Sequence, residues 1–154
     1  MKKIFLAFLA FVFVILFVTA GYTSDRFTFN GREPNGCEWW IDEASVKRNL
    51  QTEEINYWCV QTVSSLYRKQ LLKNVENELT RDDVKLIERV EFFLLHQYVD
   101  TKSKFFCNKE VKMYDSNGFL LRHSRAEVWY PINPTSPVEG ILIWMSQNCP
   151  AVLY

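Results

Sequence analysis

The dipeptide Asn117-Gly118 constrains the fold of this chain more than any other feature of its sequence. It joins two segments of apolar and aromatic residues, 105–114 and 119–124. Asn-Gly is the strongest short signal of a β-hairpin, because a type I′ turn requires a positive φ at both of its central residues. The sequence therefore predicts that these two segments pair as antiparallel strands.

A capped helix is predicted to close the chain. Ser136 is a favourable N-cap, Pro137 suits the first helical position, and Glu139 would complete a capping box. The helix is predicted to end at Cys149. Its apolar face has helical spacing and consists of Ile141, Leu142, Trp144 and Met145.

Four further segments of the sequence are predicted to be strands. They cover residues 37–42, 55–63, 89–98 and, after a break, 128–130. Two prolines, Pro131 and Pro134, then enforce a loop before the closing helix.

Two further helical segments are predicted between the second and third of these strands. The first starts near Ser65 and carries one apolar stripe of Leu71, Leu72, Val75 and Leu79. The second is a short helical turn at 81–87, for which Thr80 and Asp83 provide an N-cap signature.

Residues 1–20 have the pattern of an export signal. Lys2 and Lys3 precede an uncharged apolar run, residues 4–20, that ends in small residues. This is the pattern of a secretory signal peptide, after which the mature chain would begin at Gly21. The run is also close to the lower length limit of a membrane-spanning helix, so an uncleaved N-terminal anchor is the alternative. Both interpretations place the rest of the chain outside the cytoplasm.

The exported part of the chain is predicted to be one domain of near-neutral charge. Residues 21–36 are polar and indicate a linker, and residues 37–150 would form the domain. Without the two N-terminal lysines, 16 of the 18 basic residues remain against 18 acidic ones. This balance argues against nucleic acid and anionic lipid as partners, because both require a basic surface.

Four cysteines lie in the exported part: Cys37, Cys59, Cys107 and Cys149. An even number of cysteines in an extracytoplasmic chain favours disulfides. If the strands at 37–42 and 55–63 pair as a hairpin, Cys37 and Cys59 fall nearly opposite one another, as a disulfide requires. There is no C-x-x-C motif and no spacing typical of zinc, so no metal site is predicted.

Several short motifs follow one another along residues 37–149. In chain order they are Trp39-Trp40 with Asp42 and Ser45, Tyr57-Trp58, Cys107 before Tyr114-Asp115 and Gly118, and finally Trp129, Pro134, Ser136 and Cys149. Their order and spacing resemble the surface-adhesin protein E family of bacteria. The resemblance implies an α+β fold, a twisted antiparallel β-sheet with helices packed on it.

The resemblance also implies a disulfide and a function. Cys107 and Cys149 would pair and tie the closing helix to the sheet, whereas Cys37 and Cys59 are extra to the family pattern. The family is associated with attachment to host extracellular proteins. The implied function is an exported, non-catalytic binding module at the cell surface or envelope with a protein partner; the alternative is a membrane-anchored structural envelope protein.

Conspicuous polar residues are interpreted as structural. Asp42 and Ser45 indicate an Asx turn or cap after the first predicted strand. His96 alternates with apolar neighbours and is predicted to be a satisfied core or edge residue, whereas His123 is predicted to be solvated.

The tryptophans and the missing catalytic motifs both favour a non-catalytic protein. Four tryptophans form either an aromatic binding face or, more commonly for such residues, packing contacts: Trp39, Trp40, Trp58 and Trp129. The sequence has no G-x-S-x-G motif and no Gly-rich phosphate loop. We therefore predict neither enzymatic activity nor a cofactor.

Overall fold

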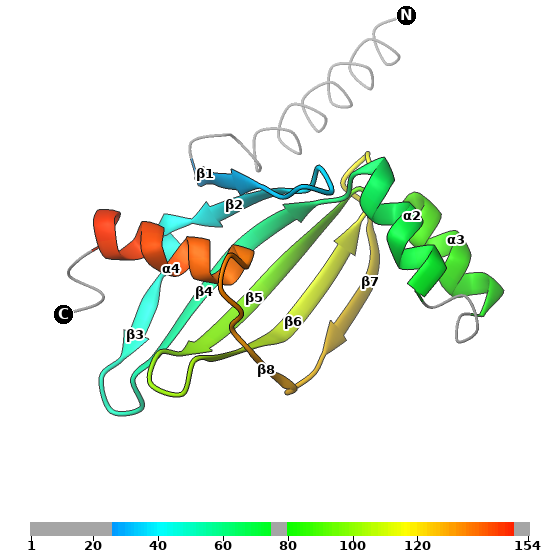
Figure 1. Ribbon diagram of the computed structural model, residues 1–154. Helices are drawn as coiled ribbons and strands as arrows, with labels where there is room; N and C mark the ends of the chain where they lie inside the picture. The colour runs from blue at the N-terminus through cyan, green and yellow to red at the C-terminus, as the bar shows by residue number, and fades with distance from the viewer. Residues whose placement is uncertain (1–25, 75–79, 150–154) are drawn as a thin grey trace, which may run out of the picture.

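The computed structural model describes residues 26–74 and 80–149 (Figure 1). These residues form one antiparallel sheet with the order β1-β2-β4-β5-β6-β7; β3 pairs with β4, and β8 pairs with β6. The strands are β1 (Phe27–Arg32), β2 (Glu38–Asp42), β3 (Lys47–Asn49), β4 (Glu54–Thr62), β5 (Phe92–Asp100), β6 (Phe105–Tyr114), β7 (Leu120–Arg125) and β8 (Trp129–Pro131). The helical elements are η1 (Glu43–Ser45), α2 (Ser65–Asn74), α3 (Arg81–Arg89) and α4 (Pro137–Asn148).

The two faces of this sheet have different surroundings. Helix α4 crosses one face, which we call the covered face, while α2 and α3 lie together at one end of the sheet (Figure 1). Side chains alternate between the faces of a strand. In β4 this alternation is complete, with every second residue from Ile55 to Gln61 buried. We call the opposite side of the sheet the outer face.

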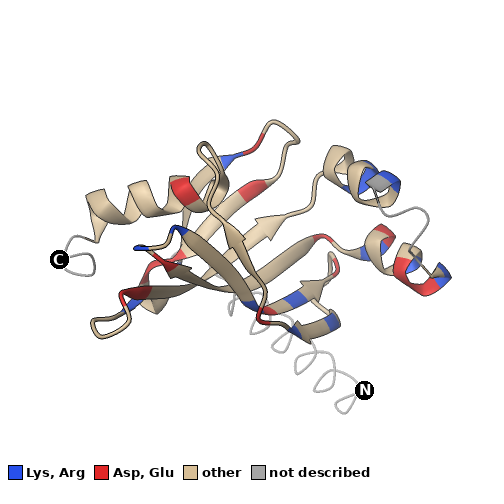
Figure 2. Cartoon of the chain, turned by 60° about the horizontal axis from the view of Figure 1, so that its bottom comes forward, with Lys and Arg blue, Asp and Glu red and all other residues tan. Residues whose placement is uncertain are grey.

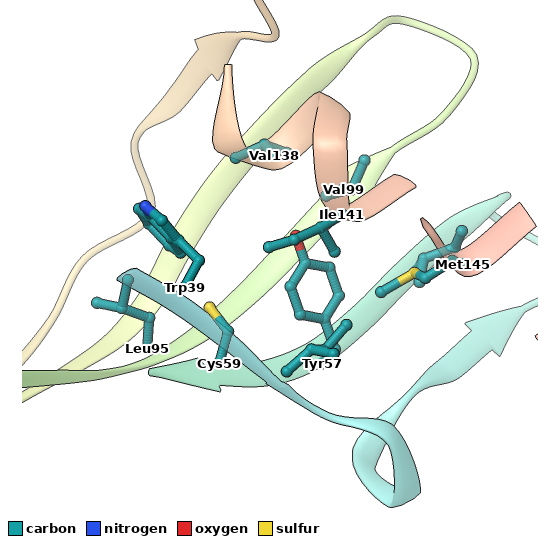
Figure 3. Packing of buried hydrophobic residues seen from close by; sticks show 10 residues of the cluster. Trp39, Tyr57, Cys59, Leu95, Val99, Val138, Ile141 and Met145 are labelled. Carbon is teal, nitrogen blue, oxygen red and sulfur yellow. The ribbon is translucent and has the colours of Figure 1, made fainter. Parts of the chain in front are cut away.

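The core lies between α4 and the covered face. Ile141 and Met145 of α4 are fully buried against Ile41, Tyr57 and Val99 from three strands (Figure 3). Burial of an aliphatic side chain of this size contributes about 1.5–3 kcal/mol. The fold is thus α+β, as the resemblance in motif order implied.

The start of α4 confirms half of the predicted capping box. Ser136 Oγ accepts a hydrogen bond from the Glu139 amide at 3.3 Å, and Pro137 occupies the first turn. The Glu139 carboxylate, however, accepts from the Thr135 amide at 2.6 Å, while the Ser136 amide donates to the Asn133 carbonyl. The loop before the helix folds back far enough to bring Thr135 to this carboxylate.

The hairpin between β6 and β7 is confirmed, but its turn is not of type I′. The Gly118 amide donates to the Asp115 carbonyl at 3.0 Å, so Ser116 and Asn117 are the central residues of the turn. Gly118 follows with φ +77° and is the residue that needs left-handed backbone, whereas Asn117 has no positive φ. Asp115 Oδ1 fixes this geometry by accepting from the Asn117 and Phe119 amides. The side chain of Asp115, at the first position of this turn, thus favours the observed turn over type I′.

The predicted linker at 21–36 is wrong at residues 27–32, which belong to the sheet. Residues Phe27–Arg32 form β1, an edge strand that pairs antiparallel with β2 across a register shift after Phe29. A short strand that carries a bulge has weak alternation, which is why composition alone indicated a loop. Residues 21–25, like the predicted signal or anchor at 1–20, lie outside the described residues.

The predicted helices and the third strand differ from the structure mainly at their ends. The capping box of Thr80 and Asp83 is confirmed, and α3 continues to Arg89 where a turn ending at residue 87 was predicted. Because the helix is longer, β5 starts at Phe92 instead of 89 and continues to Asp100. The predicted stripe residues Val75 and Leu79 lie outside the described residues.

Candidate functional site

The outer face carries a row of partly exposed aromatic side chains. The rings of Trp58 and His96 stack at 4.5 Å with an angle of 10° between their planes, and Tyr98 follows at 4.9 Å from His96. On the neighbouring strands, Phe29 meets Trp40 edge to face at 5.1 Å. Desolvation by these neighbours lowers the pKa of His96, so its ring is held in the neutral form. The row is therefore an uncharged strip across four strands.

A bulge in β6 places charged groups beside this strip. The register shifts between His96 and Gln97, which pair with Glu110 and Asn108 and leave Lys109 between them. A bulge lets two consecutive side chains point to the same face of a sheet. Lys109 and Glu110 accordingly line one depression of about 440 Å³ on the outer face, together with His96, Tyr98, Arg125, Ala126 and Glu127.

The lysines of β6 contact the aromatic strip directly. Lys109 Nζ lies 4.3 Å from the ring centre of Tyr98, and Lys112 Nζ lies 4.9 Å from the ring of Trp58. These are cation–π distances, at which the ammonium group is attracted to the negative face of the ring. The strip thus offers an arrangement of ring and cation that interfaces use often.

Glu110 is the centre of an ion-pair cluster on the same face. Its carboxylate lies 2.9 Å from Lys112 Nζ, 3.1 Å from His123 Nε2 and 3.6 Å from Arg125 Nε. The hydrogen bond from Lys112 is the main reason why the pKa of Glu110 is lowered. The charges of the outer face therefore neutralise one another locally instead of forming a single-sign patch.

The predicted tryptophan candidates divide between the two faces. Trp39 is buried on the covered face, whereas Trp40 and Trp58 are half-buried on the outer face. Trp129 of β8 is also half-buried and pairs with Cys107. The prediction of packing holds for Trp39, and the three others are available to a partner in part.

His96 and His123 lie on the same face of the sheet. Both belong to the outer face, where His96 stacks on Trp58 and His123 binds Glu110. His123 is not simply solvated, although 36% of its side chain is exposed. The signal that could have revealed this group is the sequence Lys109-Glu110 inside a strand, because two adjacent charges break the alternation.

Asp42 and Ser45 are structural, in a way that is only partly local. Ser45 Oγ donates to the Asp42 carbonyl at 2.6 Å and accepts from the Trp58 amide at 2.8 Å, which ties η1 to β4. The Asp42 side chain does not cap η1. It is fully buried and pairs with Arg26 at 2.6 Å, so the predicted Asx turn is replaced by an ion pair next to the edge strand.

The cysteines lie apart from one another and are all free thiols in this structure. Ile41, not Cys37, is opposite Cys59, which corrects the pairing geometry on which a Cys37–Cys59 bridge depended. Cys107 pairs with Tyr98 on the outer face, whereas Cys149 ends α4 near Glu43 on the other side of the sheet. The predicted disulfide between Cys107 and Cys149, and with it a disulfide-tied helix, is not found.

A count of free thiols distinguishes the two arrangements. Alkylation of the denatured, non-reduced protein should modify all four cysteines if the structure holds. Two disulfides would instead leave none to modify and lower the intact mass by about four hydrogens. Protection of Cys107 and Cys149 would require the closing helix to occupy a different position, whereas protection of Cys37 and Cys59 would require a different register between β2 and β4.

The described residues contain neither a cluster of metal ligands nor a membrane-spanning helix. There, no three His, Cys, Asp or Glu side chains come together in a way that could hold a metal ion. None of the helices in the described ranges is long and apolar enough to span a membrane. The apolar run at 4–20 lies outside those ranges.

No protein-family model matches this chain, and no match was found among curated proteins. A structure of Haemophilus influenzae protein E is similar with a TM-score of 0.48 and 11% sequence identity, over 82% of this chain and 87% of that chain. A TM-score below 0.5 supports no argument about a ligand or an activity. The likeness to the protein E family that the motif order indicates therefore stays a resemblance.

Proposed function

We propose that this chain is an exported, non-catalytic module that binds a protein partner at the bacterial cell surface or envelope through the outer face of its sheet. The observation that carries the proposal is the aromatic strip of Trp58, His96 and Tyr98 beside Lys109 and Arg125. Trp, Tyr and Arg are the residue types that most often dominate binding energy at protein interfaces.

The charge pattern favours a folded protein surface over a polyanion as the partner. Glu110 and Glu127 neutralise the cations around them, at 2.9 Å from Lys112 and 3.4 Å from Lys109. Such a surface gives specificity through local pairs and little long-range steering. Binding should accordingly weaken only slightly between low and physiological salt.

Two sources of such a partner fit an exported module. One is a host extracellular protein, which would make the chain an adhesin; the other is a component of the cell's own envelope. We favour the first because of the resemblance in motif order, which includes Trp39-Trp40 and Tyr114-Asp115. The absence of catalysis remains part of the proposal.

The test compares binding by the parent protein and by matched variants. Trp58→Ala and Tyr98→Ala should each lower affinity for the partner at least tenfold, the loss expected of an interface hot spot. Phe119→Ala is the control, because this ring is 68% exposed in the β6–β7 turn and away from the strip. Purified extracellular-matrix proteins and envelope fractions would serve as ligands. Equal affinity of all variants would overturn the outer face as the binding surface.

Hydrolysis assays address the non-catalytic part of the proposal. The parent protein should show no turnover with generic ester, peptide or glycoside substrates. Activity that survives repurification and disappears on a single substitution would contradict the proposal.

The alternative is a structural envelope protein anchored through residues 4–20. The N-terminus of the exported protein separates the two. A chain that begins at Gly21 supports release or surface display, whereas one that retains Met1 supports the anchor.

A further inference from the structure

A second concave site lies on the covered face, away from the aromatic strip. It is a cavity of about 400 Å³ between the start of α4 and Tyr67 of α2. Its apolar wall includes Trp39, Phe93, Leu95, Val111 and Val138. Three of these, Trp39, Leu95 and Val138, lie together at one end of the core cluster (Figure 3). The volume falls in the range of small-molecule sites, which are also mostly apolar.

A directional chain of hydrogen bonds runs through the floor of this cavity. The phenol of Tyr57 is fully buried and donates to Gln97 Oε1 at 2.8 Å. Since its carbonyl oxygen is thereby engaged, Gln97 presents its amide Nε2, which donates to Asn108 Oδ1 at 2.8 Å. The sequence of donors and acceptors is therefore fixed from the interior outward.

The chain ends on a donor that faces the cavity. With Oδ1 of Asn108 occupied by Gln97, the remaining polar group of this side chain is its Nδ2 amide. This amide donates to none of the described residues, and Asn108 lines the cavity. Because each bond in a relay polarises the next, Nδ2 is a stronger donor than an isolated amide. A ligand with an acceptor oxygen would therefore complement the free donor of Asn108 in this cavity.

The charge of the lining limits the ligand further. Glu33 is the charged residue of the described cavity wall, and its carboxylate accepts from Trp39 Nε1 and from Asn35 Nδ2, both at 2.7 Å. A carboxylate or phosphate on the ligand would approach this negative group without a lysine or arginine in the described lining to compensate. The charge of α4 does not change this, since the helix is free of charge apart from Glu139 (Figure 2).

We infer that this cavity binds a neutral small molecule with an apolar body and one acceptor oxygen, which takes a hydrogen bond from Asn108 Nδ2. The apolar body would lie against Trp39, Leu95 and Val138. The inference does not depend on the outer face, because the cavity opens on the opposite side of the sheet.

A pair of fluorescent probes tests the inference on the unmodified full chain. Prodan, a dimethylaminonaphthalene that carries a propionyl ketone, is neutral, flat and supplies one strong acceptor. Its emission should shift to the blue on binding. The analogue in which a methylene replaces the ketone, 2-propyl-6-(dimethylamino)naphthalene, should bind about fivefold more weakly, the ratio expected for one hydrogen bond. Equal affinity of the two probes, or binding of neither, would overturn the inference.

Matched variants locate the probe. Asn108→Asp keeps the acceptor for Gln97 but removes the donor and adds a negative charge, so Prodan binding should fall at least tenfold. Asn56→Asp makes the same change on the outer face and should leave Prodan binding unchanged. Should Asn108→Asp fail to fold, the probe pair on the parent protein still decides.

The Trp58→Ala variant separates this inference from the proposed function. It should lower affinity for the partner at least tenfold and leave Prodan binding intact. Loss of Prodan binding in Trp58→Ala would place the probe on the outer face and overturn the cavity as its site. Loss of partner binding alone leaves the cavity supported.

Discussion

The covered and outer faces of the sheet are made by the same strands but differ in how far their side chains are buried. On the covered face, Ile55, Tyr57 and Cys59 of β4 are fully buried under α4. On the outer face, the residues between them, such as Asn56 and Trp58, stay half-exposed. One face therefore contributes stability through apolar burial, and the other presents rings and ion pairs that are only partly desolvated.

This difference shows what an alternating pattern does and does not determine. Alternation fixes which residues share a face, but it does not say which face a helix will cover. Here α4, which carries one charged residue, Glu139, covers one face. The more highly charged helices α2 and α3 lie at the end of the sheet (Figure 2). An aromatic residue on the face without a helix is then a candidate for binding.

The largest effect is expected from truncating a side chain of α4 that packs on the covered face. Ile141→Ala should lower the free energy of unfolding by about 2–5 kcal/mol, because it leaves a cavity in the core. Ile143 lies two residues further along the same helix and is 53% exposed, so Ile143→Ala is the matched control and should change little. Chemical denaturation measures both. Similar losses in the two variants would show that α4 does not pack on the sheet as described.

A smaller effect is expected in the turn that positions β7. Gly118→Val should cost roughly 1–3 kcal/mol, because a β-branched residue is strained at positive φ. Gly118 has φ +77°, and β7 carries His123 and Arg125 to Glu110 on the outer face. Gly31→Val is the control, since Gly31 has open space around it and no positive φ. Equal stability of Gly118→Val and the parent would contradict this turn.

The parts of the fold that the sequence predicted are those with local causes. Ser136 and Thr80 begin helices because their own side chains bind the helix amides, and β6 was placed correctly from residue 105 to 114. The bulge at Lys109 depends instead on pairing between two strands. Pairing register is a tertiary property that the sequence of one strand does not contain.

The candidate site was predicted less well than the fold for the same reason. The tryptophans were recognised as candidates, but Lys109, Glu110 and Tyr98 were not, because the bulge brings them together. The predicted Cys37–Cys59 geometry was wrong because of the strand register too. The assumed hairpin placed Cys37 opposite Cys59, whereas Ile41 of β2, four residues further along the chain, is the residue opposite Cys59. The order of motifs along the chain does not determine which residues of two strands lie opposite one another.

An effect of about 1 kcal/mol is expected from the cap that starts α4 over the covered face. Ser136→Ala removes the oxygen that accepts the Glu139 amide, and loss of an N-cap costs this much on average. Ser146→Ala near the other end is the control, because Ser146 Oγ only donates to a carbonyl one turn back, that of Ile143. Thermal unfolding should separate the two. A cost at Ser146 as large as at Ser136 would argue against the cap.

The smallest effect is a pH dependence that belongs to the outer face. Burial lowers the pKa of His96, with Lys109, Lys112 and Lys47 acting in the same direction and Glu110 opposing them. Between this lowered pKa and the ordinary value of about 6.5, the unfolded chain binds more protons than the folded one. The stability that neutral His96 contributes is therefore present above that range and is lost as the pH falls through it.

The variant His96→Phe isolates this contribution while keeping the ring stacked on Trp58. Urea denaturation at about pH 8 and about pH 5 brackets the ordinary histidine pKa. The parent should lose more stability between these two conditions than His96→Phe does, because only the parent must protonate a ring held between Trp58 and the lysines. A covered-face variant such as Ile141→Ala should show the same pH-dependent loss as the parent. If His96→Phe and the parent lost equal stability on acidification, the outer face would be too well hydrated to desolvate its aromatic strip.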